Sequence, residues 1–83
     1  MTDDQAVSRR AVLERLAATS DVDGETTTTA AALAAALDAD EERVATHLAG
    51  LIACDLARQN DDGRVRVTIT GKELLELDAD GAI

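Results

Sequence analysis

The sequence contains no Phe, Trp, Tyr or Pro, and it has a single cysteine, Cys54, and a single lysine, Lys72. Without aromatic side chains, the core must be built from Leu, Val, Ile and Ala, and each of these buries less apolar area than an aromatic ring. Without proline, the turns must rely on Gly, Asp and Asn. A lone cysteine cannot form an internal disulfide, so a reducing cytoplasm is the expected setting.

Long apolar runs and catalytic patterns are also missing. No stretch approaches the roughly 20 apolar residues of a membrane-spanning helix, and no basic segment followed by an apolar run opens the chain, so we expect a soluble protein without a membrane partner. The sequence has one histidine, His47, no glycine-rich phosphate loop and no EF-hand spacing among its acidic residues. We therefore expect neither an enzyme nor a cofactor, and no metal site from His47 and Cys54 alone.

Acidic residues dominate the charge. The chain carries 17 Asp and Glu against 8 Lys and Arg, for a formal net charge of −9, and the acid is spread from Asp3 to Asp80. Dispersed acid with little lysine and much alanine resembles the composition of proteins from halophilic archaea, and salt screening makes such self-repulsion tolerable. The alternative is an acidic protein adapted to ordinary salt. With 83 residues, 46% of them hydrophobic, we expect one small folded domain over residues 1–83.

Hydrophobic spacing predicts three helices in the first two thirds of the chain. Val12, Leu13 and Leu16 fall on one side of a helix over residues 5–18. The β-branched run 26–29 favours a short strand, and its last threonine can cap a helix over 30–37. Asp40 can cap a third helix over 41–54, with an apolar stripe made of Val44, Leu48, Leu51 and Ile52, and with Cys54 packed at its end as a small hydrophobe.

The pattern then changes to strands. Residues 56–59 and 64–67 are short strand candidates joined by an Asn-Asp-Asp-Gly turn, which predicts a hairpin over 56–68. Thr68 can cap a last helix over 69–77, anchored by Leu74, Leu75 and Leu77, before loose residues at the end of the chain. The predicted order is helix, short strand, helix, helix, two strands, helix: a mainly α fold with a small β-hairpin (α+β).

Two segments of the sequence carry a resemblance. Leu33 to Leu51, with its Leu-Ala start, short turn, acidic cap and Val-x-x-His-Leu-x-x-Leu ending, resembles the helix-turn-helix core of archaeal and bacterial regulators. Asp55-Leu56 followed by Asp62 to Leu75 resembles the wing and the Thr-x-x-Gly helix start that follows it. From residue 7 to 77 the chain thus resembles winged helix-turn-helix proteins of the arsenic-repressor and multiple-antibiotic-resistance-repressor type. It departs from them at Asp55, where a glycine is usual, and at Ala45-Thr46, where basic residues are frequent.

The resemblance implies a transcriptional regulator that binds double-stranded DNA, with the third helix in the major groove and the hairpin against the backbone. A homodimer is the expected form. Gly50 is expected to let the helix approach DNA closely, and His47 either packs at the edge of the core or donates to a phosphate. The candidate DNA-binding residues are Arg43, Thr46, His47, Gly50, Arg58, Arg64 and Arg66.

Two alternatives remain open at this point. Arg64 and Arg66 share one side of their strand, and they could simply face water, paired with Asp61 and Asp62 of the turn. Winged helices also serve as protein–protein interaction modules in transcription, replication and chromosome-maintenance assemblies, so the fold alone does not decide the function. The acidic balance favours such a module, whereas the position of the arginines favours DNA.

Overall fold

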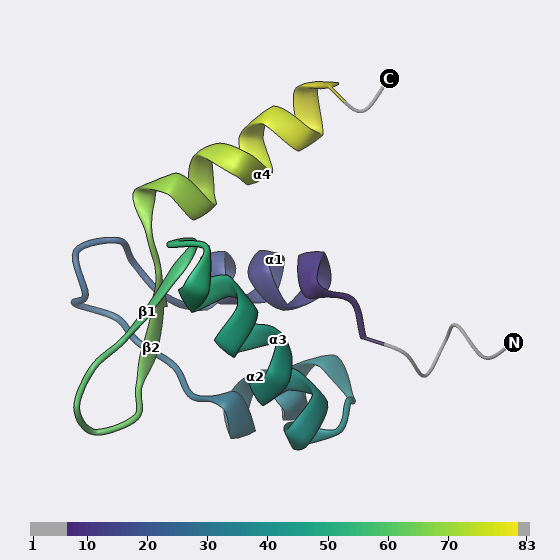
Figure 1. Cartoon of the computed structure of the whole chain (residues 1–83), viewed down its shortest axis with the longest axis vertical. Coiled ribbons are helices and arrows are strands. Elements are labelled where there is room, and N and C mark those ends of the chain that lie inside the picture. The colour runs from purple at the N-terminus through teal and green to yellow at the C-terminus, as the bar shows by residue number, and fades with distance from the viewer. Residues whose placement is uncertain (1–6, 82–83) are drawn as a thin grey trace, which may run out of the picture.

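The computed structural model describes residues 7–81, with side chains through Leu77. Within this range the chain forms four helices and a two-stranded antiparallel sheet, as Figure 1 shows. In chain order the elements are α1 (Arg9–Thr19), α2 (Ala30–Leu37), α3 (Glu41–Ala53), β1 (Ala57–Gln59), β2 (Val65–Val67) and α4 (Ile69–Gly81). The prediction of a mainly α fold with a small hairpin is confirmed. No helix in the described range is long and apolar enough to cross a membrane.

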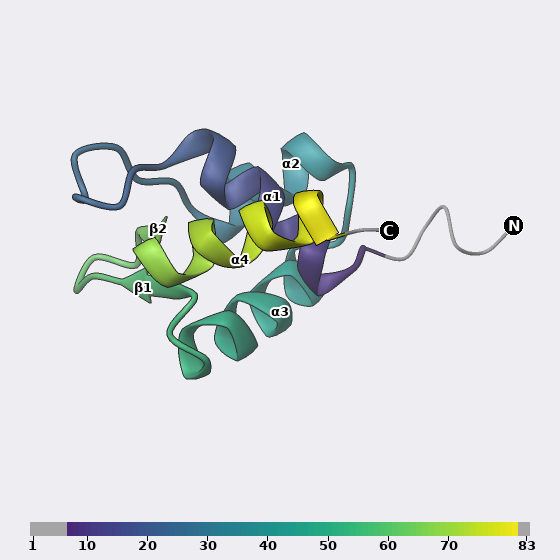
Figure 2. The ribbon, with the colours of Figure 1, turned by 90° about the horizontal axis from the view of Figure 1, so that it is seen from above.

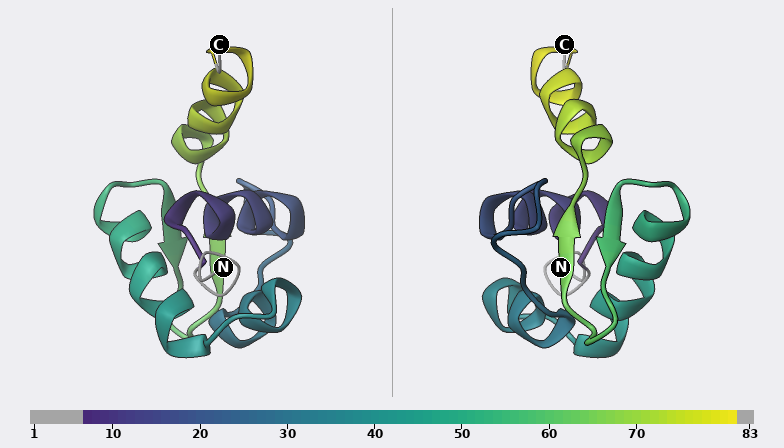
Figure 3. Two further views of the ribbon diagram at one scale, coloured as in Figure 1. Left: turned by 90° about the vertical axis from the view of Figure 1, so that its right-hand side faces the viewer. Right: turned by 90° about the vertical axis from the view of Figure 1, so that its left-hand side faces the viewer.

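The core lies between the first three helices and the inner face of the hairpin. In Figure 3 the hairpin stands between α3 on one side and α1 with its following loop on the other. The apolar stripe predicted for the third helix is confirmed for Val44, Leu48 and Leu51, while Ile52 is only half-buried. The buried apolar residues are Val12, Leu13, Leu16, Leu33, Ala34, Val44, Leu48, Leu51, Ala57, Val65 and Val67.

Local capping groups determine where the helices begin. Ser8 has an extended backbone, and its Oγ accepts a hydrogen bond of 3.0 Å from the amide of Ala11, so α1 begins at Arg9. The predicted start at residue 5 is therefore wrong for residues 7 and 8, and residues 5 and 6 lie outside the described range. Thr29 caps α2 as predicted, through a 3.1 Å bond from the amide of Ala32. Asp40 occupies the N-cap of α3, but its side chain makes no capping hydrogen bond.

The sheet is smaller than the predicted strands. Its register pairs Ala57 with Val67, Arg58 with Arg66 and Gln59 with Val65. The strand expected over 26–29 is reduced to one isolated bridge between Thr28 and Val65. Its hydrogen bonds, 2.9 Å from the amide of Thr28 and 2.8 Å from the amide of Val65, attach this segment to the free edge of β2.

The chain leaves α3 through a left-handed residue. Asp55 has φ +64°, the conformation for which the resembled families use glycine and which aspartate tolerates better than most residues. Helix α3 ends at Ala53, so Cys54 is its C-cap rather than its last helical residue. The Cys54 side chain is exposed, and the expectation that it packs as a small hydrophobe is wrong. The turn at Asp55 directs Leu56, not Cys54, toward the core.

Helix α4 departs most from the prediction. It continues to Gly81, so residues 78–81 are helical rather than loose. It lies above α1 (Figure 2) and extends away from the hairpin (Figure 1). Leu75 is half-buried, but Leu74 is 42% exposed and Leu77 is 68% exposed, so two of the three predicted anchors are wrong. The helix meets the body on the side that carries the buried Gly71, and Leu77 points elsewhere.

Candidate nucleic-acid interface

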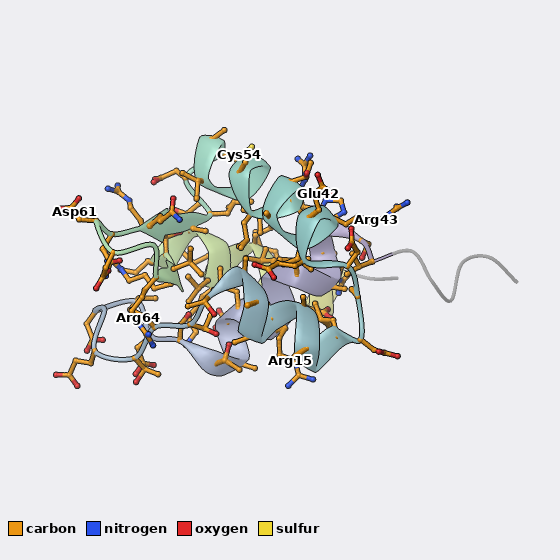
Figure 4. The ribbon with its side chains drawn as sticks, turned by 90° about the horizontal axis from the view of Figure 1, so that it is seen from below. Arg15, Glu42, Arg43, Cys54, Asp61 and Arg64 are labelled. Carbon is orange, nitrogen blue, oxygen red and sulfur yellow. The ribbon has the colours of Figure 1, made fainter. Side chains whose placement is uncertain are left out.

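The predicted site residues come from two elements, α3 and the hairpin. Figure 4 views the molecule from the side on which α2, the start of α3 and the hairpin turn all face the viewer. Arg43, at the start of α3, and Arg64, on the hairpin, lie toward opposite ends of this view. The structure therefore does not bring Arg43 and Arg64 together in one cluster.

The polar residues of α3 are partly committed to contacts within the chain. Arg43 is exposed. The hydroxyl of Thr46 donates to the carbonyl oxygen of Glu42, one turn earlier, at 3.0 Å, which leaves it only as an acceptor toward a ligand. The half-buried His47 has its Nε2 2.9 Å from the carbonyl oxygen of Val7. This contact confirms that His47 packs at the edge of the core, against the segment before α1.

Gly50 has a different role from the expected one. A Cβ built on Gly50 would lie 3.0 Å from the Cζ of Arg9, so the guanidinium of Arg9 fills the space above the glycine. The helix surface is therefore not free at Gly50. Because Gly50 follows Arg43 by two helical turns on the same side of α3, Arg9 and Arg43 place two positive charges along one flank of the helix. The sequence places Arg9 on the outer face of the first helix, but its position above Gly50 depends on how α1 packs on α3.

The opposite flank of α3 is apolar. Ala45, Ala49 and the half-buried Ile52 line a shallow hollow of about 140 Å³ between α3 and the hairpin, together with Ala30, Leu48, Gln59, Gly63 and Val65. No charged side chain lines this hollow. The surface between the two candidate DNA-binding elements is thus suited to apolar contact more than to phosphate.

The three hairpin arginines lie on the outer face of the sheet, because Ala57, Val65 and Val67 occupy its inner face. Arg58 forms an ion pair of 3.2 Å with Asp55. Arg64 donates from Nε to the hydroxyl of Thr27 at 2.6 Å and from a terminal nitrogen to the Thr27 carbonyl oxygen at 3.2 Å.

Arg66 makes neither kind of contact. Its Nε is buried and has no hydrogen-bond partner within the described residues. The alternative in which Arg64 and Arg66 pair with Asp61 and Asp62 is not what the structure shows, because the partner of Arg64 is Thr27. The contact with Thr27 spans 37 residues of sequence, and no local pattern indicates it.

Comparisons of the chain with protein-family models, with curated proteins and with solved structures found no match. Its function therefore has to be argued from the residues themselves. Three features bear on it: two hairpin arginines, Arg64 and Arg66, without a carboxylate partner in the described part of the chain, a basic flank of α3, and an apolar hollow between the two elements.

Proposed function

We propose that the chain is a winged helix-turn-helix protein that binds double-stranded DNA as a transcriptional regulator in a salt-adapted cytoplasm. In this proposal α3 enters the major groove and the β1–β2 hairpin lies against the backbone. The element order supports it: α1, the Thr28 bridge, α2, α3, the hairpin and α4 follow one another as such a fold requires. The observation that carries the proposal is that Arg64 and Arg66 have no carboxylate partner among the described residues, although most of the 17 acidic residues of the sequence lie in that range.

Hydrogen bonds hold the Arg64 side chain in a conformation in which it can bind a phosphate. Its two hydrogen bonds to Thr27 are made to neutral oxygens, so its positive charge is not neutralised. A guanidinium has about five N–H donors, of which roughly three remain for an anion. Because the side chain is already ordered, binding costs less conformational entropy than it would for a freely rotating arginine.

The net charge of −9 sets the conditions under which DNA can bind. At low salt, the acidic surface repels the phosphate backbone over about a Debye length, and at high salt this repulsion is screened. High salt also weakens the gain from counterion release, so hydrogen bonds and shape must carry the affinity. We therefore place the working range of the protein in concentrated salt.

The test is DNA affinity in molar KCl, measured by fluorescence anisotropy with the DNA upstream of its own gene. Arg64→Gln is expected to weaken binding about tenfold, because it removes one phosphate contact made by a charged group. Lys72→Gln is the matched control: it removes the same charge at an exposed position of α4, outside α3 and the hairpin, and should leave the affinity unchanged. A parent protein that binds no duplex at any KCl concentration would falsify the proposal.

A second function is favoured by the apolar hollow between α3 and the hairpin. Ala45, Ala49 and Ile52 offer a surface on which an apolar side chain of a protein partner can be buried. The corresponding proposal is a protein–protein interaction module in a transcription, replication or chromosome-maintenance assembly. Failure of DNA binding in the test above, with the fold intact, makes this function the favoured one.

The exposed leucines of α4 support a homodimer. Leu74 and Leu77 are spaced i, i+3 and share one flank of the helix. A neighbouring hollow between α1, α3 and α4 is lined by Leu13, Leu51, Leu56, Leu74 and Leu75, with Arg9 and Arg10. We propose that the α4 helices of two copies pack together over this leucine-rich surface.

The dimer proposal predicts a sedimentation-equilibrium mass of twice 8.7 kDa for the parent protein. The double variant Leu74→Ser, Leu77→Ser is expected to be monomeric with unchanged helix content, since both residues are exposed in the single chain. Ala31→Ser, which introduces a serine at an exposed position of α2, should leave the mass at that of the dimer. A monomeric parent at high protein concentration contradicts the proposal.

A further inference from the structure

A polar pocket lies where the hairpin passes into α4. Figure 1 shows this junction of the backbone above β2. It measures about 380 Å³, ample for several water molecules or a small ion. Four segments that are distant in the sequence build it: the loop before α2, the turn after α3, the hairpin and the start of α4. Its lining residues are Val22, Asp55, Arg58, Arg66, Thr68, Ile69 and Thr70.

Two arginines stand beside each other at this pocket. Arg58 and Arg66 are direct partners in the antiparallel register, so both side chains project from the outer face of the sheet at the same level. Like charges directly opposite each other across two strands are destabilising. Asp55 compensates one of them through its 3.2 Å ion pair with Arg58. Arg66 forms no ion pair with the carboxylates of the described range.

The surroundings of Arg66 make the absence of a partner for its guanidinium in the described residues energetically unfavourable. Its side chain is partly buried and packs over Gly24, where a Cβ would lie 3.4 Å from a terminal guanidinium nitrogen. Its Nε is buried without an acceptor in the described part of the chain. An unpaired, buried N–H of a charged group is strongly unfavourable unless something supplies an acceptor. The sequence has more than twice as many acidic as basic residues, yet within residues 7–77 no carboxylate forms an ion pair with this guanidinium.

The remaining polar groups of the pocket are mostly donors. The hydroxyl of Thr68 is already occupied, since it donates to the carbonyl oxygen of Asp55 at 2.7 Å and accepts from the amide of Gly71 at 3.0 Å. Thr70 contributes an exposed hydroxyl. Ile69 and Thr70 also carry the first amides of α4, which have no partner inside the helix. Guanidinium, hydroxyl and amide donors around an arginine without an ion-pair partner in the described range suit an oxyanion such as phosphate.

We infer that this pocket binds a phosphate group, with Arg66 as its principal ligand and Arg58 and Thr70 as secondary ones. The phosphate oxygens accept hydrogen bonds from the terminal guanidinium nitrogens of Arg66, and the negative charge of the phosphate stabilises the facing pair of arginines. Asp55, the one acidic residue in the pocket, opposes binding and limits the affinity. The group belongs either to a small phosphorylated molecule or to a nucleic-acid backbone. The inferred site shares Arg66 with the proposed DNA function, and the last arm of the test below separates the failure of one from the failure of the other.

The test is an NMR titration of the ¹⁵N-labelled chain with inorganic phosphate, at an ionic strength held constant with KCl. Phosphate is expected to shift the Nε–H resonance of Arg66 and the amides of Ile69 and Thr70 in one saturable process. Arg66→Gln should weaken this binding at least about tenfold. Arg15→Gln is the matched control, because it removes the same charge at an exposed position of α1 and should not change the phosphate affinity.

The variant Asp55→Asn is expected to change the phosphate affinity in the opposite direction to Arg66→Gln. Asparagine accommodates the left-handed backbone of residue 55 at least as well as aspartate does, so the turn is retained. Removal of the opposing carboxylate should tighten phosphate binding several-fold, an outcome that unfolding cannot produce. The inference is overturned if no saturable shift occurs, if Arg66→Gln and Arg15→Gln behave alike, or if Asp55→Asn weakens binding.

A last arm of the same experiment identifies the source of the phosphate. If duplex DNA displaces inorganic phosphate from the pocket, the group belongs to the backbone of the nucleic acid. If phosphate remains bound beside DNA, or if the chain binds phosphate but no DNA, the group belongs to a small molecule. The last outcome ends the DNA proposal and leaves the phosphate site standing.

Discussion

Gly71→Ala is expected to lower the free energy of unfolding by about 2–3 kcal/mol, because no space exists for a methyl group at this position. A Cβ on Gly71 would lie 2.5 Å from the carbonyl oxygen of Leu56, 2.9 Å from Cγ2 of Val67 and 3.3 Å from Cδ1 of Leu13. The carbonyl of Leu56 also accepts the amide of Thr68 at 3.2 Å, so it cannot move without disturbing the start of α4. For a domain of this size, such a loss is a large share of the total stability.

Gly50→Ala is the matched control, since it makes the same change inside another helix. The Cβ at Gly50 would meet only the guanidinium end of Arg9, an exposed and flexible side chain that can move aside. Gly50→Ala is then expected to raise the free energy of unfolding by about 0.5–1 kcal/mol, because alanine has a higher helix propensity than glycine. Urea denaturation of both variants separates the two effects. If Gly71→Ala is as stable as Gly50→Ala, α4 does not approach Leu56 as closely as the structure shows.

Ser20→Ala is expected to cost about 2 kcal/mol, because one hydroxyl joins the end of α1 to the sheet. Ser20 is only 4% exposed. Its Oγ donates to the carbonyl oxygen of Leu16 at 2.7 Å and accepts from the amide of Val67 at 2.9 Å. Without this oxygen the amide of Val67, a fully buried residue, has no acceptor, and that loss is larger than the loss of an exposed hydrogen bond.

The neighbouring residue offers the control for this prediction. Thr19 donates its hydroxyl to the carbonyl oxygen of Arg15 at 2.7 Å, the same i−4 geometry, but no sheet amide depends on it. Thr19→Ala should therefore change the stability by no more than about 0.5 kcal/mol. Thermal and urea unfolding give the two values, and hydrogen exchange at Val67 should accelerate only in Ser20→Ala. Equal losses in the two variants would show that the bond to β2 contributes nothing.

Much of the architecture follows from short-range signals in the sequence. Helices α2 and α3 lie where apolar spacing and the caps at Thr29 and Asp40 predict them, to within one residue. The hairpin follows from a two-residue alternation and an Asp-Gly turn. These features can be predicted from the sequence because a helix cap, an apolar stripe and a tight turn each depend on residues only a few positions apart.

Only the outline of the candidate site could be predicted from the sequence. Alternation correctly places Arg64 and Arg66 on the outer face of the hairpin, but it does not indicate what they meet there. Thr27 orders Arg64, the loop at Gly24 covers Arg66, and Arg9 covers Gly50. Each of these contacts joins segments that are far apart in the sequence, so each depends on the relative positions of whole elements.

By itself, then, the sequence determined the helices, the hairpin, the apolar core and the acidic, aromatic-free composition, because each is a local pattern or a sum over residues. Only the tertiary structure decided which side of α4 faces the body, since the close approach of Gly71 to Leu56 sets the rotation of that helix. That rotation leaves Leu74 and Leu77 in solvent and completes the pocket beside Arg66. The surfaces available to a partner thus arise from packing between distant elements, which no local pattern of residues encodes.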